Sequence, residues 1–203
     1  MRLSRLWAPL LLAALALALP ARAATPIATT GAWLDHAEAH HPDPNWNKPN
    51  AAVPRAPKRS DDDGLEQTSA TIRPAAFPED RAVKAAGWLL VGAAQTFGPL
   101  TLIFGCQGFD GMQRPEGTQA FVFVGGRFAG TLSPKPMGAR TDGQIGDIQV
   151  WDLDNISADY VRYTPSDALC CPSRESYAGF KVVKRNGAPV VVLDSVYTQD
   201  TPH

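Results

Sequence analysis

The second half of the chain carries short runs of apolar residues, several alternating with polar ones, that predict antiparallel β-strands. The clearest pair lies within residues 119–132, where the run FVFV is followed by Gly125-Gly126 and a second apolar run. Glycine adopts the positive φ that two-residue hairpin turns require, so this stretch predicts a hairpin. Asn186-Gly187 predicts a second one, between strands at residues 177–184 and 189–197.

The remaining strands and one helix complete the expected fold. Further strands are expected at residues 89–97, 100–104, 148–151 and 156–163. A short helix is expected to begin at Pro78, since Glu79 and Asp80 place acidic side chains in its first turn. The short connections force antiparallel pairing, so we predict a mainly β fold, an antiparallel meander of about seven strands preceded by one short helix. Both a sheet packed by the helix and a partly closed barrel fit this pattern.

Several long motifs resemble those of one protein family. They are FVFVGGRFAGTLSPKPM from residue 121, the ARTDG loop from residue 139, DYVRYTPSDALCCPS from residue 159, AVKAAGW from residue 82 and DGM from residue 110. Together they resemble the LppP/LprE lipoprotein family of bacterial envelope proteins, over residues 78–196. The resemblance implies an exported envelope protein with no assigned biochemical activity and no catalytic residue to transfer. It gives a β domain at residues 77–198, with a tail at 199–203.

Residues 1–23 have the form of a secretory signal peptide. Arg2 and Arg5 precede an apolar run over residues 6–19, and Ala21-Arg22-Ala23 supplies small residues for cleavage. The run is shorter than the ~20 residues of a spanning helix, so no membrane span is expected after cleavage. The sequence departs from the lipoprotein pattern, because no cysteine precedes Cys106. We therefore expect an unlipidated protein that is periplasmic or secreted.

Residues 24–76 form a Pro-rich segment with few bulky apolar side chains. Such a composition buries too little surface to offset the entropy of ordering. We interpret the segment as largely disordered and dispensable for folding, with a short helical turn near residues 33–40. Trp33 and Trp46 are its candidates for local docking on the β domain.

The chain has three cysteines, and export into an oxidising compartment favours a disulfide. Cys170 and Cys171 are adjacent, and extended neighbours point to opposite faces. We therefore predict a bond from Cys106 to either Cys170 or Cys171, which leaves one thiol.

Candidate chemistry is sparse. His36, His40 and His41 form a weak candidate metal site, because His36 and His40 would share one face of a helix. The predicted β domain holds no histidine to activate a cysteine or serine nucleophile. Its aspartates fall mainly at predicted turns, where Asp is favoured for local backbone bonding. We expect no cofactor and no enzymatic activity. A hydrolase using loop carboxylates and a metal-handling protein are the alternatives.

The remaining candidates are polar residues in or beside the central loops. Arginine holds carboxylate or phosphate groups bidentately, and loops on a rigid sheet commonly carry binding groups. The candidate binding residues are Arg114, Lys135, Arg140, Asp142, Arg162 and Arg174. Without the three arginines of the predicted signal peptide, 16 basic residues stand against 20 acidic ones, and this net charge of −4 argues against nucleic-acid binding. The sequence thus predicts an exported binding or interaction domain whose partner is an envelope component or a small polar ligand.

Overall fold

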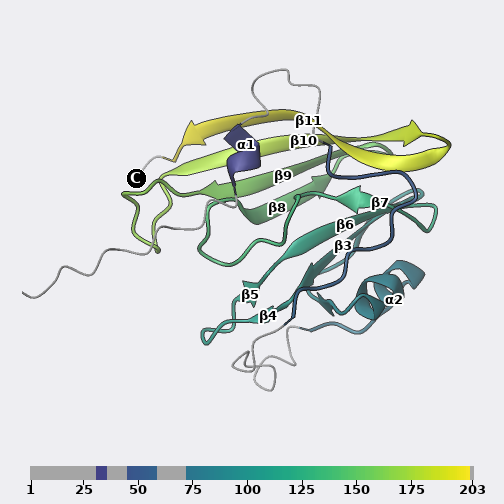
Figure 1. Ribbon diagram of the computed structural model, residues 1–203, viewed down its shortest axis with the longest axis horizontal. Coiled ribbons are helices and arrows are strands. Elements are labelled where there is room, and N and C mark those ends of the chain that lie inside the picture. Colours follow the sequence, from purple (N-terminus) through teal and green to yellow (C-terminus); the bar gives the residue numbers. More distant parts are fainter. Residues whose placement is uncertain (1–30, 36–44, 59–71, 202–203) are drawn as a thin grey trace, which may run out of the picture.

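The structure is a computed structural model that describes residues 31–35, 45–58 and 72–201 (Figure 1). These residues form two short helices and eleven strands. The helices are α1 (Ala32–Asp35) and α2 (Pro78–Ala85). The strands are β1 (Leu89–Leu90), β2 (Gln95–Phe97), β3 (Leu100–Cys106), β4 (Gly108–Phe109), β5 (Pro115–Glu116), β6 (Gln119–Val124), β7 (Arg127–Thr131), β8 (Gln144–Val150), β9 (Asn155–Arg162), β10 (Arg174–Arg185) and β11 (Ala188–Asp200).

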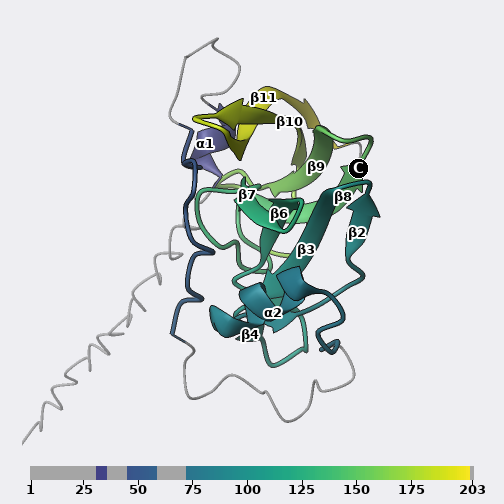
Figure 2. The same cartoon turned by 90° about the vertical axis from the view of Figure 1, so that its right-hand side faces the viewer.

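The strands form two main antiparallel sheets that face each other (Figures 1 and 2). One has the order β1-β3-β6-β7, with β2 also paired to β3, and the other has the order β11-β10-β9-β8. The small β4–β5 pair stands apart from both. The predicted mainly β, antiparallel fold is confirmed. The sheets remain open, so the part of the chain that the structure describes contains no closed barrel. The strand expected at residues 89–97 is divided into β1 and β2, and the strands that were not expected, β4 and β5, have two residues each.

Both hairpins predicted from glycine turns are present. Gly125 and Gly126 adopt φ values of 55° and 76° between β6 and β7. Asn186 and Gly187 adopt 51° and 72° between β10 and β11. These positive φ values match the right-handed strand twist, which explains why the two turns were readable from sequence. The second hairpin is longer than expected, because β11 runs to Asp200 and so includes the first two residues of the predicted tail.

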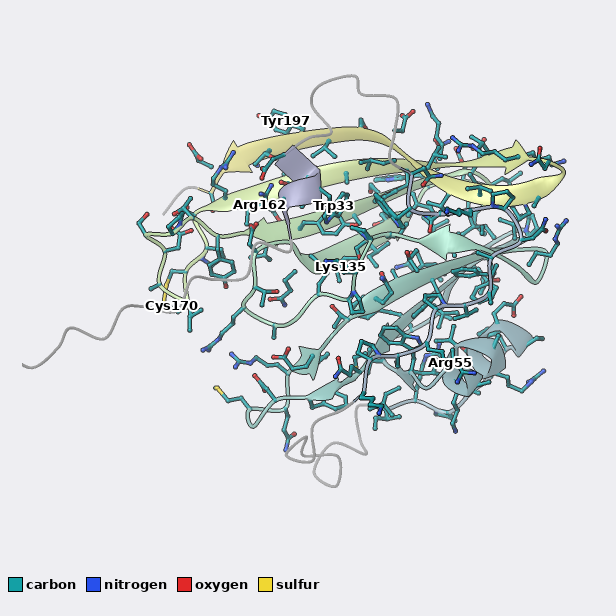
Figure 3. All side chains as sticks on the ribbon, in the orientation of Figure 1. Trp33, Arg55, Lys135, Arg162, Cys170 and Tyr197 are labelled. Atoms are coloured by element: carbon teal, nitrogen blue, oxygen red, sulfur yellow. A yellow bond between two sulfur atoms is a disulfide. The ribbon has the colours of Figure 1, made fainter. Side chains whose placement is uncertain are left out.

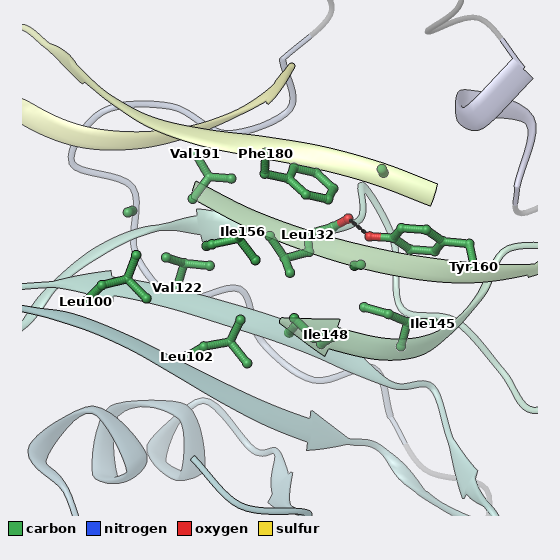
Figure 4. Close-up of a cluster of buried hydrophobic side chains, with 14 of the residues drawn as sticks. Leu100, Leu102, Val122, Leu132, Ile145, Ile148, Ile156, Tyr160, Phe180 and Val191 are labelled. Atoms are coloured by element: carbon green, nitrogen blue, oxygen red, sulfur yellow. Dashed lines mark hydrogen bonds between the residues drawn. The ribbon is translucent and has the colours of Figure 1, made fainter. Parts of the chain in front are cut away.

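The main core fills the space between the sheets (Figure 4). Leu100 and Val122 of one sheet pack against Ile156 and Phe180 of the other. The Tyr160 hydroxyl enters the same core and donates a hydrogen bond of 2.5 Å to the carbonyl oxygen of Leu132. Burial of this phenol, with the nearby charge of Asp159, raises the pKa of Tyr160 well above its ordinary value.

A second core lies on the other side of β3 and β6, under α2. There Ile103, Phe121 and Phe123 pack against Val83 of the helix and against Trp88. Strand β6 is therefore covered on both faces, which explains its unbroken apolar run. Helix α2 begins at Pro78, as predicted.

The interpretation of residues 24–76 as largely disordered is wrong for residues 31–35 and 45–58, which pack on the sheets, and for residues 72–76, where Ile72 pairs with Val91. Leu34 of α1 is completely buried in the main core, and Trp33 stacks edge-on against Tyr160 at a centroid distance of 5.1 Å. Helix α1 overlaps the beginning of the helical turn expected near residues 33–40, and the rest of that turn lies outside the described residues. The segment has few apolar residues, but contacts from a few large side chains such as Leu34 and Trp33 are enough to fix it on the sheets.

Residues 45–58, here called the strap, run along the side of the two sheets. In Figure 2 the strap is a dark blue trace that passes from the upper sheet to the level of α2. Two of its backbone groups are fixed to the region around α2. The backbone N–H of Ala56 donates to the carbonyl of Ala86 at 2.9 Å, and the Pro54 carbonyl accepts a bond from Trp88.

The edges of the two sheets are bridged by amide side chains, because no strand pairing joins them. Gln95 of β2 donates to the carbonyl of Ile148 at 2.7 Å and accepts from the N–H of Val150 at 3.2 Å. Asn47 of the strap joins β7 to β11, because its side chain donates to the carbonyls of Thr131 and Val191 and accepts from the N–H of Thr131. Each amide provides one donor and one acceptor group, which suits it to bridge two backbone edges.

No helix among residues 31–35, 45–58 and 72–201 is long and apolar enough to cross a membrane. The predicted signal peptide at residues 1–23 lies outside the described residues.

Candidate binding site

The structure disperses the polar residues that the sequence marked as binding candidates. Arg162 is buried and is held from two sides, by Asp142 at 2.8 Å and by Asp35 of α1 at 2.8 Å. Burial opposes its charged form, but the hydrogen bonds to both carboxylates raise the pKa of Arg162 above its ordinary value. Arg174 lies 3.7 Å from Asp200 at the open end of the β10–β11 hairpin. These residues secure α1 and the strand ends rather than line a site.

Two further candidates, Arg114 and Arg140, have local partners, and the backbone N–H of Arg140 donates to the side chain of Gln144 at 2.6 Å. Arg114 forms an ion pair with Asp110, within the loop between β4 and β5. Burial raises the pKa of Tyr163, the positive charge of Arg140 opposes that rise, and the charges of Asp167 and Arg114 raise and lower it further. The Tyr163 hydroxyl is already bonded to the Leu169 carbonyl at 3.1 Å.

The predicted disulfide between Cys106 and one of the two adjacent cysteines is wrong. A disulfide joins Cys170 to Cys171, and Cys106 is not part of it. Cys106 is completely buried at the end of β3, packed with Val91 and Phe109. The vicinal pair is exposed in the loop between β9 and β10, at the far end of the other sheet (Figure 3). The expectation failed because sequence order does not reveal that these positions belong to different sheets.

Carboxylates also serve local structure. Asp152 accepts hydrogen bonds from the backbone N–H of Asp154 and from the side chain of Asn155, which lower the pKa of Asp152 to about 2. Within the described ranges, no group of three His, Cys, Asp or Glu side chains is placed to hold a metal ion. The weak candidates His36, His40 and His41 lie outside the described residues.

The strap is anchored at Asn47, whose side chain fits against β7. Its Nδ2 group donates to the carbonyls of Thr131 and Val191 at 2.9 and 3.2 Å, and its Oδ1 atom accepts from the Thr131 N–H at 2.9 Å. Gly130 makes room for this contact, because a Cβ atom there would lie 2.3 Å from the Asn47 side chain. Its φ of 144° also disfavours other residues.

Two tryptophans fix the strap above and below Asn47. The Trp46 indole donates to Thr131 at 3.1 Å, and its ring packs edge-on against Trp33 at 5.1 Å. The indole of Trp88, which precedes β1, donates to the Pro54 carbonyl at 2.8 Å. The strap is thus held at both ends and spans the surface between.

A groove of about 310 Å³ lies between the strap and β7 with the segment that follows it. Such a volume is at the small end of the ~300–1,000 Å³ typical of ligand sites. The lining residues are Trp46, Asn47, Lys48, Ala51, Ala52, Pro54, Arg55, Pro57, Trp88, Gln119, Phe128, Gly130, Thr131, Pro134 and Pro136. Aromatic rings and prolines dominate this lining, and it contains no Asp or Glu.

The neutral polar side chains of the groove are already bonded within the protein. Gln119 donates to the Ser133 carbonyl at 3.1 Å and accepts from the Ser133 hydroxyl at 2.8 Å. The Thr131 hydroxyl donates to the same carbonyl at 2.8 Å. Asn47 and the two indoles are engaged as described above. The side chains of Asn47, Gln119 and Thr131, here called the floor of the groove, therefore already form hydrogen bonds with other protein groups.

Cations surround this apolar lining. Lys48 and Arg55 are exposed on the strap, and Lys135 is exposed on the opposite side between two lining prolines. Figure 3 shows Lys135 and Arg55 on the same side of the molecule. None of the three forms an ion pair with a residue that the structure describes. Lys135 was a sequence candidate. The strap residues were missed, because a Pro-rich segment gives no periodic signal.

Comparison with known proteins gives one family. The family model described as LppP/LprE lipoprotein matches residues 97–184, which confirms the resemblance seen in the sequence. No curated protein and no solved structure matches the chain. The matched region supplies the β7 side of the groove, whereas the strap and Trp88 lie outside it.

Proposed function

We propose that the chain acts in the bacterial envelope by binding a ligand in the groove beside the strap, because residues 97–184 match the LppP/LprE lipoprotein family model. The observation that carries this proposal is the groove itself. It is concave and apolar, and it is built on a sheet whose position is fixed by two cores.

Binding, rather than catalysis, is the role that the lining supports. General acid–base or nucleophilic chemistry needs groups such as Asp, Glu, His, Cys or Ser beside the reacting atoms. None of these residue types lines the groove, and the polar groups on its floor are engaged in holding the strap. The hydrolase alternative requires paired carboxylates in a cleft, which this lining lacks.

We further propose that the protein is exported and carries no lipid, so that it is periplasmic or secreted. The apolar run and the Ala21-Arg22-Ala23 site support cleavage before Ala24, and Cys106 is the first cysteine of the chain. Intact-mass measurement of the exported protein should give a chain that begins at Ala24. Added acyl mass, or a different first residue, would contradict this part of the proposal.

A neutral dye that fluoresces in apolar surroundings, N-phenyl-1-naphthylamine, tests the groove. We expect saturable binding to the mature chain. Ala52 lines the groove and is exposed, so Ala52→Trp should obstruct it and weaken binding at least about tenfold. Ala168→Trp, which adds the same ring to an exposed loop, is the matched control.

The proposal fails if the wild-type chain does not bind the dye saturably. It also fails if Ala52→Trp and Ala168→Trp bind the dye with equal affinity, because the bound dye would then lie elsewhere. Circular dichroism of both variants verifies that the fold is retained.

A further inference from the structure

We propose that the ligand of this groove is an amphiphile with a single anionic head group, a phosphate or a carboxylate, on one alkyl or acyl chain. The inference rests on the proposed function and adds the chemical class of the ligand. It follows from three properties of the groove: its satisfied polar floor, its apolar walls and its cationic rim.

The floor favours an alkyl chain over a peptide or a sugar. Peptide and sugar ligands carry many donors and acceptors, and each one buried without a partner costs free energy. The side chains able to serve them are Asn47, Gln119 and Thr131, and all three are committed to internal bonds. Both indole N–H groups are likewise committed. An alkyl chain needs none of these bonds.

The walls provide matching apolar surface. Phe128 lies on the β7 side, and Pro54 and Pro57 lie on the strap side. The cavity of about 310 Å³ holds the volume of roughly ten water molecules at ~30 Å³ each. A methylene group occupies a similar volume, so a single chain of about ten carbons matches the volume of the groove.

The rim selects the charge of the head group. Lys48 and Arg55 approach from the strap and Lys135 from the other side, without any lining carboxylate to neutralise them. Guanidinium and ammonium groups bind phosphate and carboxylate through charge-assisted hydrogen bonds. A head group held in water at the rim keeps its solvation, while the chain is removed from water below it.

Isothermal titration of the mature chain with decyl phosphate, decanoate, decanol and inorganic phosphate tests the inference, each below its micelle-forming concentration. We expect both ten-carbon anions to bind at least about tenfold more tightly than decanol, and inorganic phosphate to show no measurable binding. Shortening the chain to octyl phosphate should weaken binding about tenfold, since two methylenes leave the apolar site. A preference between phosphate and carboxylate distinguishes a lipid phosphate from a free fatty acid.

Two double variants separate the rim from the overall charge. Lys48→Ala/Arg55→Ala should weaken decyl phosphate about tenfold and leave decanol unchanged. Lys184→Ala/Arg185→Ala removes the same two charges from the exposed end of β10 and should change neither ligand. Lys135→Ala provides an independent single-residue test of the rim.

The failures of the two proposals are distinguishable. Equal affinities for decanol and decyl phosphate, or equal losses in both double variants, would overturn the anionic head group while the dye-binding groove stands. Binding of the dye without binding of any ten-carbon ligand would overturn the alkyl chain. Absence of both dye and alkyl binding would overturn the proposed function as well.

Discussion

The strap should be held in place chiefly by Asn47, and truncation of this residue should destabilise the whole domain. Asn47 is 8% exposed, and its amide makes three hydrogen bonds to the backbone of β7 and β11. In Asn47→Ala the N–H of Thr131 and the carbonyl of Val191 lose this partner. No paired strand replaces the amide at this edge of the two sheets.

The magnitude follows from the bonds lost. Each hydrogen bond contributes about 1 kcal/mol net, and a buried group left without a partner costs about 1–3 kcal/mol. We therefore expect Asn47→Ala to lower the free energy of unfolding by about 3–4 kcal/mol. For a chain of this size that corresponds to a fall in Tm of roughly 6–16 °C. Asn47→Asp should lose at least as much, because its carboxylate would face the two carbonyl oxygens that Nδ2 now contacts.

Urea denaturation monitored by far-UV circular dichroism measures this loss. Lys48→Ala is the matched control, because Lys48 is the exposed neighbour in the same strap and should change stability by less than about 0.5 kcal/mol. Faster tryptic cleavage after Arg55 in Asn47→Ala would identify the strap as the part released. A loss below about 1 kcal/mol would refute the reasoning, since one ordinary hydrogen bond accounts for that much.

Further predictions concern the contacts around the strap, α2 and the cysteines. Gly130→Ala should destabilise the wild type both through the positive φ at this position and by clashing with Asn47; only the clash is relieved in Asn47→Ala, so a double-mutant cycle of unfolding free energies should show coupling. Burial raises the pKa of Asp80, but donors from Arg73 and the N–H groups of Ala76 and Phe77 outweigh it and lower the pKa overall. The unfolded value is about 3.9, so the stability from Asp80 is complete above that pH and is lost on acidification below it. Asp80→Asn should flatten the stability profile in this window, and an unchanged profile would contradict the assignment. Non-reducing peptide mapping should place the disulfide between Cys170 and Cys171 and leave it intact in Cys106→Ser, whereas a crosslink to Cys106 would contradict the structure.

The parts of the fold that sequence predicts are those with local causes. The turns at Gly125-Gly126 and Asn186-Gly187 need positive φ, and glycine and asparagine tolerate it, so these residues predict the hairpins from sequence. Helix α2 is similarly predicted by Pro78 and by the acidic residues that follow it in the first turn. Strands of two residues, such as β4 and β5, are too short to show any alternation.

The groove was not predictable, because its contacts are not local. Asn47 binds partners 84 and 144 residues away in the sequence, and no pattern around residue 47 records them. The number of apolar residues in a segment does not predict whether it docks, because the strap is held by two tryptophans, Trp46 and Trp88, and the amide of Asn47. The charged residues that sequence did single out were mostly sought as ligand-binding groups, yet Arg114 and Arg162 have carboxylate partners in the fold. Only Lys135 lies beside the groove.

The strap connects the stability of the fold to the affinity of the groove, because the same segment serves both. Asn47 joins β7 to β11, while its neighbours Trp46 and Lys48 line the site. A ligand that touches both walls binds the docked strap only, so at a hundred times its Kd it stabilises docking by about 2.7 kcal/mol. That is close to the contribution expected of Asn47. Conversely, a variant with a partly released strap binds more weakly in proportion to the docked fraction, even where every contact to the ligand is intact. Affinities of strap variants must therefore be compared at measured stability, and a loss of affinity at unchanged stability is what identifies a residue that contacts the ligand.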